Sequence, residues 1–217
     1  EVGGDFYDFY FVNKDTLAFL IADVSGKGIP AAMFMMNAKA VLKSYAESGL
    51  DVNKVFTLGN EKLCEGNDAG MFVTAWMGFL NTETGEVTFA NAGHNPPLVR
   101  HADGSFEYLK VRAGFVLAGM EGVKYRKNEL QLAPGDVIYL YTDGVTEATN
   151  INDELYGEDR LLALLNANKE ASMEELCKLV KEDVFAFAGE APQFDDITML
   201  ALKYCGATAP TNQEEAL

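Results

Sequence analysis

Aspartates in four short segments of the sequence have the surroundings expected of metal ligands. The segments are Gly3-Gly4-Asp5, Ala22-Asp23-Val24-Ser25-Gly26, Tyr141-Thr142-Asp143-Gly144 and Phe194-Asp195-Asp196-Ile197-Thr198. Asp23 and Asp143 follow long apolar runs and Asp195 precedes another, so these carboxylates are predicted at strand ends rather than on a solvated face. Buried carboxylates repel one another unless a cation or a proton joins them. Mg²⁺ and Mn²⁺ prefer oxygen ligands, and two such ions can turn a bridging water into a nucleophile near neutral pH.

Each segment taken alone has a simpler explanation, because Asp before Gly commonly caps a turn or a helix. Four such segments in one chain favour a shared carboxylate site. Zinc is not indicated, since Cys64, Cys177 and Cys205 have neither metal-ligand nor paired spacing. Their odd number suits ordinary thiols in a reducing compartment, and we expect a cytoplasmic protein.

The composition predicts a single globular domain. A chain of 217 residues lies near the upper size of one domain. The net charge of −16 argues against nucleic acid and anionic membranes as partners. No apolar run approaches the roughly 18 residues of a membrane span, and no signal peptide opens the sequence. Residues 206–217 have no apolar pattern, so we predict a domain over residues 1–205 followed by a disordered tail.

The elements that must position the aspartates follow an α+β order. A hairpin is predicted where Phe6 to Val12 and Thr16 to Ala22 flank a short polar loop. A helix over Ala31 to Glu47 follows Pro30, and its polar stripe opposes a wide apolar face. We assign its methionines, Met33, Met35 and Met36, to the core. A second helix is predicted over Val52 to Cys64.

The rest of the chain is predicted to form strands and two helices near its C-terminal end. The predicted strands of an antiparallel meander are Met71 to Leu80, Val87 to Ala90, Leu98 to Arg100 and Phe106 to Leu109. A turn at Ala133-Pro134-Gly135-Asp136 leads into a strand over Val137 to Tyr141. Helices are expected over Glu158 to Leu165 and Ser172 to Ala188, and Ile197 to Lys203 closes the domain as a strand.

Six segments together resemble a known family. They are Glu1-Val2-Gly3-Gly4-Asp5-Phe6-Tyr7-Asp8, Ala22-Asp23-Val24-Ser25-Gly26-Lys27-Gly28, Asn91-Ala92-Gly93-His94-Asn95-Pro96-Pro97, Leu132-Ala133-Pro134-Gly135-Asp136, Tyr141-Thr142-Asp143-Gly144-Val145-Thr146-Glu147-Ala148 and Asp195-Asp196-Ile197-Thr198. They resemble, in family order and over nearly the whole chain up to Lys203, the bacterial SpoIIE/RsbU branch of the metal-dependent serine/threonine phosphatases, the PPM class. The resemblance implies a sandwich of two antiparallel β-sheets flanked by helices, with a two-metal site at one edge between the sheets.

The resemblance also implies an activity and its partners. The enzyme would hydrolyse phosphoserine or phosphothreonine on a protein, typically an anti-sigma-factor antagonist of a bacterial partner-switching pathway, with two Mn²⁺ or Mg²⁺ ions. Because the sequence starts at the first metal motif, we expect this domain to be excised from a longer chain with an upstream sensor or regulatory segment.

Carried over position by position, the family's metal ligands are four aspartates and one backbone carbonyl. Asp5, Asp23, Asp143 and Asp195 would supply the carboxylates, with Asp23 bridging the two ions, and the main chain of Val24 would supply the carbonyl. Asp196 is the less favoured half of its pair. For Asp8, Asp136 and Glu147 the simpler explanations are a strand-end polar residue, a turn residue and a helix-start residue.

Two departures from the eukaryotic members concern the proton donor and the phosphate. Where those members carry Asp-Gly-His-Gly, this chain has Asp23-Val24-Ser25-Gly26, so the histidine often assigned as general acid is absent. His94 is a candidate proton donor, and the alternative is a turn residue hydrogen-bonded to the backbone. No arginine lies near Asp5 in sequence, whereas the eukaryotic members use one to bind the phosphate. Phosphate binding would then depend mainly on the metals and at most on Lys27, which we expect to be solvated.

Three rival interpretations are weaker. Gly3-Gly4-Asp5 resembles the start of a diguanylate cyclase signature but lacks the following Glu, and Gly26-Lys27-Gly28 lacks the Ser or Thr of a P-loop. A catalytically silent member of the same fold, acting as a binding module, is the third. Four retained aspartates argue against it, because a silent copy has no physical reason to keep mutually repelling carboxylates.

Overall fold

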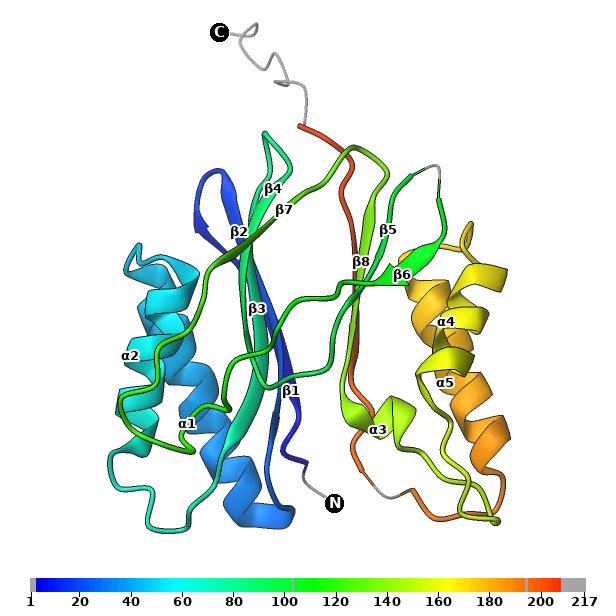
Figure 1. Cartoon of the computed structure of the whole chain (residues 1–217), viewed down its shortest axis with the longest axis horizontal. Helices are drawn as coiled ribbons and strands as arrows, with labels where there is room; N and C mark the ends of the chain where they lie inside the picture. Colours follow the sequence, from blue (N-terminus) through cyan, green and yellow to red (C-terminus); the bar gives the residue numbers. More distant parts are fainter. Residues whose placement is uncertain (1–2, 103, 194, 208–217) are drawn as a thin grey trace, which may run out of the picture.

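The computed structural model describes residues 3–102, 104–193 and 195–207, in which two antiparallel sheets face one another (Figure 1). The first sheet has the order β1-β2-β3-β4-β7 and the second β6-β5-β8-β9. The strands of the first are β1 (Phe6–Asn13), β2 (Thr16–Val24), β3 (Val73–Asn81), β4 (Glu86–Ala92) and β7 (Asn128–Gln131). Those of the second are β5 (Leu98–Arg100), β6 (Phe106–Tyr108), β8 (Val137–Tyr141) and β9 (Met199–Lys203).

Helices cover the outer face of each sheet, which gives four layers (Figure 1). The helices α1 (Gly28–Glu47) and α2 (Val52–Cys64) pack on the first sheet, and α4 (Glu158–Ala167) and α5 (Met173–Ala188) on the second. One further short helix, α3 (Asp143–Thr146), follows β8 directly. No helix of the described residues is long and apolar enough to cross a membrane. The predicted sandwich flanked by helices is therefore confirmed.

The core between the two sheets is built around Trp76, which is 0% exposed. Its ring lies 5.3 Å from that of Phe19 and 5.3 Å from that of Phe89, one on each neighbouring strand. A Cβ on Gly78 would lie 2.7 Å from the Trp76 ring, so the indole needs a glycine at that position of β3. This aromatic cluster fixes the two sheets face to face and thereby the distance between their ends.

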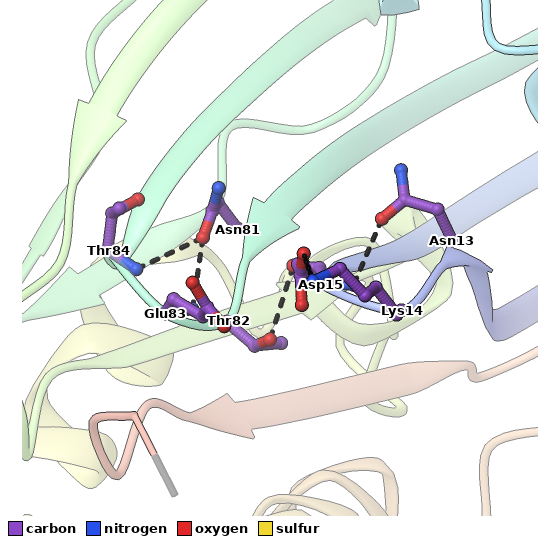
Figure 2. A network of polar contacts seen from close by, with 7 residues as sticks. All are labelled: Asn13, Lys14, Asp15, Asn81, Thr82, Glu83 and Thr84. Atoms are coloured by element: carbon purple, nitrogen blue, oxygen red, sulfur yellow. Dashed lines mark hydrogen bonds and ion pairs between the residues drawn. The ribbon is translucent and has the colours of Figure 1, made fainter.

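Two hairpin turns are tied together at one end of the first sheet (Figure 2). The Thr82 amide donates to the Asp15 carbonyl at 2.8 Å, which joins the β3–β4 turn to the β1–β2 turn. Within each turn a side chain replaces a missing backbone partner, since Asn13 accepts from the Asp15 amide and Asn81 from the Thr84 amide, both at 3.0 Å. The register that pairs Thr16 with Asn81 here pairs Asp23 with Thr74 at the opposite end of the sheet.

Most predicted elements are confirmed, and the differences have local causes. The predicted meander is interrupted, because β4 pairs with β7 whereas β5 pairs with β8 in the other sheet. The short polar strand β7 and the single-turn helix α3 were not predicted, since neither is long enough to show a period. Of the predicted tail, residues 208–217 lie outside the described residues.

The assignment of the α1 methionines to the core is wrong for two of the three. Met33 and Met36 are 67% and 68% exposed, and Met35 alone packs against the core. The face that meets the sheet is instead made of Ala31, Ala38, Leu42 and Ala46, and the small side chains of the three alanines allow a close approach of helix and sheet. The apolar face of α1 is wider than its contact with the sheet, so the residues at the margins of that face remain in solvent.

Candidate metal centre

The four predicted aspartates converge on one end of the sandwich from four separate chain segments. Asp5 precedes β1, Asp23 lies at the end of β2, Asp143 begins α3 just after β8, and Asp195 lies shortly before β9. Antiparallel pairing sets these positions side by side, because Phe6 is opposite Ala22 in the first sheet and Tyr141 opposite Met199 in the second. The site is therefore made of residues at the same end of both sheets.

Glycines let these segments approach closely. A Cβ built on Gly4 would lie 2.8 Å from the Val24 carbonyl oxygen, so the segment before β1 passes directly against the proposed backbone ligand. A Cβ on Gly3 would overlap the Asp196 carboxylate, and one on Gly144 would overlap the Asp196 carbonyl. Glycines at these positions are thus required by the contacts themselves.

Thr142 is a site residue that sequence reasoning missed. Its side chain is fully buried, and its hydroxyl donates to the Asp5 carboxylate at 2.7 Å. The hydroxyl oxygen of Thr142 also accepts a hydrogen bond from the Thr198 amide at 3.0 Å. Thr142 thereby orients Asp5 and links both sheets. The only signal in the sequence was its place between Tyr141 and Asp143.

Burial and mutual repulsion raise the pKa values of the clustered carboxyls. Burial first, then the charges of Asp5 and Asp143, raises the pKa of Asp23 to about 8. Burial raises the pKa of Asp5 to about 6, although hydrogen bonds from Thr142 and Thr198 work in the opposite direction. Burial and the neighbouring Asp195 raise the pKa of Asp143 as well. Asp5 and Asp23 share a hydrogen bond, which requires a proton on one of them.

Carboxylate and carbonyl oxygens fit hard divalent cations in their chemistry. Among the described residues, no three His, Cys, Asp or Glu side chains are arranged as a group that could hold a metal ion. The aspartates nonetheless raise one another's pKa values, so they are near neighbours whose present arrangement suits a shared proton. A cation replacing that proton would have to draw the carboxylates around itself.

Asp195 and Asp196 both face the cluster. The charge of Asp195 raises the pKa values of Asp23 and Asp143, and that of Asp196 raises the pKa of Asp5. The Lys27 ammonium lies 3.8 Å from the Asp195 carboxylate and is 48% exposed on its side chain. Lys27 is exposed to solvent, as expected, and its ammonium also lies beside the site at the start of α1.

The three acids given simpler explanations differ from one another. Asp8 forms an ion pair of 3.5 Å with Lys39, which joins β1 to α1 away from the cluster. Asp136 is a turn residue. Burial acts to raise its pKa, but hydrogen bonds from the Ala133 amide, His101 and the Ala102 amide outweigh burial and lower it. Glu147 directly follows α3 rather than starting a helix. Burial, then the charges of Asp143 and Asp195, raises the pKa of Glu147, so it lies close to the cluster.

His94 is held as a structural bridge. Its ring is 4% exposed, its Nε2–H donates to the Tyr141 carbonyl at 3.1 Å, and its Nδ1 accepts from the Thr74 hydroxyl at 2.8 Å. Burial lowers its pKa to about 4. The ring is therefore neutral, with both nitrogens engaged between β3 and the end of β8. This geometry favours the alternative of a hydrogen-bonded turn residue over a proton donor.

Substitution of His94 by Ala is expected to lower stability, by about 2 to 4 kcal/mol, because it leaves a cavity and unpaired buried groups. The pH–rate profile of the folded fraction should keep its shape, since a ring of pKa about 4 donates no proton near neutral pH. Urea unfolding and pH–rate profiles of both proteins measure this. Loss of a basic limb from the profile at unchanged stability would restore His94 as the proton donor.

Comparisons with known proteins agree with this geometry. A family model described as stage II sporulation protein E (SpoIIE) matches residues 13–204. Phosphoserine phosphatase RsbU of Bacillus subtilis is 31% identical over 204 residues, which cover 94% of this chain and 60% of RsbU. The structure of the RsbU and RsbW domains of Rv1364c from Mycobacterium tuberculosis matches with a TM-score of 0.83 at 26% identity, covering 95% of this chain and 56% of that one.

A second similar structure is RsbX in complex with magnesium, with a TM-score of 0.66 at 18% identity over 93% of this chain and 87% of RsbX. This chain spans less than two thirds of the length of RsbU and of the Rv1364c chain. The family match extends over most of the sequence and over both sheets. The chain therefore belongs to the SpoIIE family, the bacterial SpoIIE/RsbU branch of the PPM-type phosphatases.

Proposed function

We propose that this chain is a metal-dependent protein phosphatase that hydrolyses phosphoserine or phosphothreonine on a protein. The observation that carries the proposal is the convergence of Asp5, Asp23, Asp143 and Asp195 on one sheet edge, with the pKa of Asp23 raised to about 8. Such a cluster is destabilising unless a cation compensates it, and its place at the edge leaves it open to a macromolecular substrate.

The relatives support the substrate class. RsbU is named a phosphoserine phosphatase, and an RsbU domain shares the Rv1364c chain with an RsbW domain. By analogy, the substrate is a phosphorylated anti-sigma-factor antagonist of a partner-switching pathway in the cytoplasm. The relatives' greater length also supports an upstream sensor or regulatory segment in the full-length protein.

The residues that would hold two Mg²⁺ or Mn²⁺ ions are Asp5, Asp23, Asp143 and Asp195, with the Val24 carbonyl. The family is metal-dependent. When bound, the ions would acidify coordinated water and offset charge on the phosphoryl oxygens. The protein's own part is orientation. Thr142 fixes the Asp5 carboxylate and Gly4 brings the N-terminal segment against Val24.

Lys27 and the start of α1 are placed to attract the phosphoryl group. Lys27 is the N-cap of α1, no acidic residue lies in the first turn, and the Lys27 ammonium lies beside Asp195. Amides at a helix N-terminus and a nearby ammonium both favour an anion. This pair compensates in part for the arginine that eukaryotic members use.

The thiols are not nucleophiles here. Burial raises the pKa values of Cys64 and Cys177, which keeps both protonated near neutral pH, and they lie on α2 and α5. Cys205 lies after β9, beyond the far end of that strand from the aspartates. Without a thiolate in a phosphate-binding loop, a cysteine-phosphatase mechanism has no support.

The test is turnover of p-nitrophenyl phosphate and of a phosphoserine peptide with Mn²⁺, with Mg²⁺ and with chelator. We expect activity with either metal and none with chelator. Metal-independent turnover would contradict the mechanism. Absence of turnover under every condition, with tight binding of a phosphoprotein, would favour the silent binding module instead.

Asp195→Asn is expected to reduce activity more than Asp196→Asn, by about tenfold or more. The reason is that the charge of Asp195 raises the pKa values of both Asp23 and Asp143, whereas the charge of Asp196 raises that of Asp5. Turnover against Mn²⁺ concentration, with each variant's melting temperature as the folding control, measures this. A larger loss in the Asp196 variant would exchange their roles.

A further inference from the structure

A polar cavity lies beside the segment that joins β6 to β7. It has a volume of about 210 Å³. Its polar lining comes from Arg112, Lys124 and Arg126 together with Asn91 and Asn128. Three cations thus share one concave surface with two amides, in a chain whose net charge is −16.

The three cations differ from most of those elsewhere in the chain. The other basic residues mainly pair with acids, such as Lys39 with Asp8, Lys62 with Glu65 and Arg160 with Asp183. Within the described part of the chain, Arg112, Lys124 and Arg126 form no ion pair, and all three are exposed. Unpaired cations gathered in a cavity of a strongly acidic protein have room for an external anion.

The wall that carries two of them is fixed. Tyr125, between Lys124 and Arg126, is 5% exposed and its hydroxyl donates to the Val116 carbonyl at 3.1 Å. The fully buried Asn60 of α2 also holds this segment, accepting from the Ala118 amide and donating to the Met120 carbonyl, both at 2.9 Å. With Tyr125 turned inward, its two neighbours project outward from a held backbone, which limits the entropy lost on binding.

The cavity is joined to the metal centre through the sheet. The Gly114 amide donates to the Asn91 carbonyl at 2.8 Å, and the Asn91 side chain holds the His94 backbone. Further along the same segment, the amides of Val73 and Leu117 donate to each other's carbonyls at 2.9 and 2.8 Å, and Val73 pairs with Val24. Asn91, which lines the cavity, also lies opposite Trp76 on β3, and Trp76 lies opposite Ile21 on β2, two residues before Asp23. The cavity therefore lies two strands across the sheet from Asp23.

We propose that this cavity binds acidic side chains of the phosphoprotein substrate, next to the phosphorylated residue presented to the metal centre. The proposal rests on the proposed phosphatase function. Guanidinium groups bind carboxylates in a bidentate manner, and the cavity is the place where an otherwise acidic protein attracts an acidic partner. It would supply recognition of the protein around the phosphate, which the aspartates and the metals do not provide.

The test uses two phosphoserine peptides of equal length, one with three acidic residues beside the phosphoserine and one with the corresponding amides. Parent protein, Arg126→Glu and Lys110→Glu are compared by kcat/KM at low salt. Lys110 is the matched control, because it lies in the same segment, is exposed and lines a different cavity. Both substitutions change the net charge by the same amount.

We expect the parent to prefer the acidic peptide by about tenfold, mainly through KM, and the preference to decline with salt. Arg126→Glu should bring the ratio of the two peptides to about one, and Lys110→Glu should leave it unchanged. Equal loss in both variants would show a general charge effect and overturn the proposal. So would a parent with no preference.

Binding of inorganic phosphate, used as a probe, distinguishes a site for small anions from a site for the substrate protein. Phosphate binding that Arg126→Glu removes, without any peptide preference in the parent, would reassign the cavity and overturn the proposal. Hydrolysis of p-nitrophenyl phosphate by the parent reports on the phosphatase function separately. If it is absent, the function fails; if it is present while the peptides are hydrolysed alike, only the cavity's role fails.

Discussion

Replacement of Asp23 by Asn is expected to reduce phosphatase activity by at least about a hundredfold while stabilising the metal-free protein. Asp23 has the highest pKa of the clustered carboxyls, about 8, because burial and the charges of Asp5 and Asp143 oppose its ionisation. An amide keeps the hydrogen bond to Asp5 without the charge. At pH 8 the gain in unfolding free energy should be about 1 kcal/mol or more.

Turnover with saturating Mn²⁺ and urea unfolding in chelator measure the two effects. Asp15→Asn is the matched control, since Asp15 lies in the turn at the opposite end of the sheet and its carboxylate pairs with the exposed Lys14. It should change neither quantity appreciably. An Asp23 variant that keeps chelator-resistant activity, or that loses stability in chelator at pH 8, would contradict the assignment of Asp23 to the metal centre.

The sequence predicted the elements that carry long patterns. The β1–β2 hairpin and the helices α1, α2, α4 and α5 all have enough residues to show a period of two or 3.6, and the structure has them. The four-residue helix α3 has no period to detect. Its start at Asp143 nevertheless positions a proposed ligand, so the least predictable element is also one of the most important.

The convergence of the aspartates could be predicted, but the supports around them could not. Asp23 and Asp143 stood out because each ends an apolar run. Thr142 did not, since a threonine in a strand is ordinary until its hydroxyl is seen to contact Asp5 at 2.7 Å. His94 stood out for its residue type, and the sequence could not show that both its ring nitrogens are occupied.

The solvent exposure of side chains was the property hardest to predict from the sequence. The α1 methionines occupy positions that a wide apolar face would bury, yet Met33 and Met36 lie beyond the contact with the sheet. The clustering of Arg112 with Lys124 and Arg126 depends on the path of a segment without secondary structure. That path is set by Asn60 and Tyr125, which are distant in sequence and gave no pattern.

The metal-free protein is expected to lose stability as the pH rises from 6.5 to 8, and divalent cation should remove this loss. In the folded state Asp23 has a pKa of about 8, above the usual value near 4 of an unfolded chain. The folded protein therefore holds a proton that the unfolded chain has released, so the unfolding free energy falls as pH rises through this window. The loss is at most about 2 kcal/mol, since one pKa unit is worth about 1.4 kcal/mol.

This window separates Asp23 from His94 and Asp5. His94, with a pKa lowered to about 4 by burial, makes stability rise with pH only below about 6.5, and Asp5, near 6, is largely ionised above it. Melting curves at pH 6.5 and 8, with chelator and with Mn²⁺, test the prediction. Metal at a hundredfold excess over Kd should add about 2.7 kcal/mol, and more at pH 8 because protons no longer compete. Midpoints that respond to neither pH nor millimolar Mn²⁺ would show that these carboxylates do not form a metal site, whatever the family resemblance.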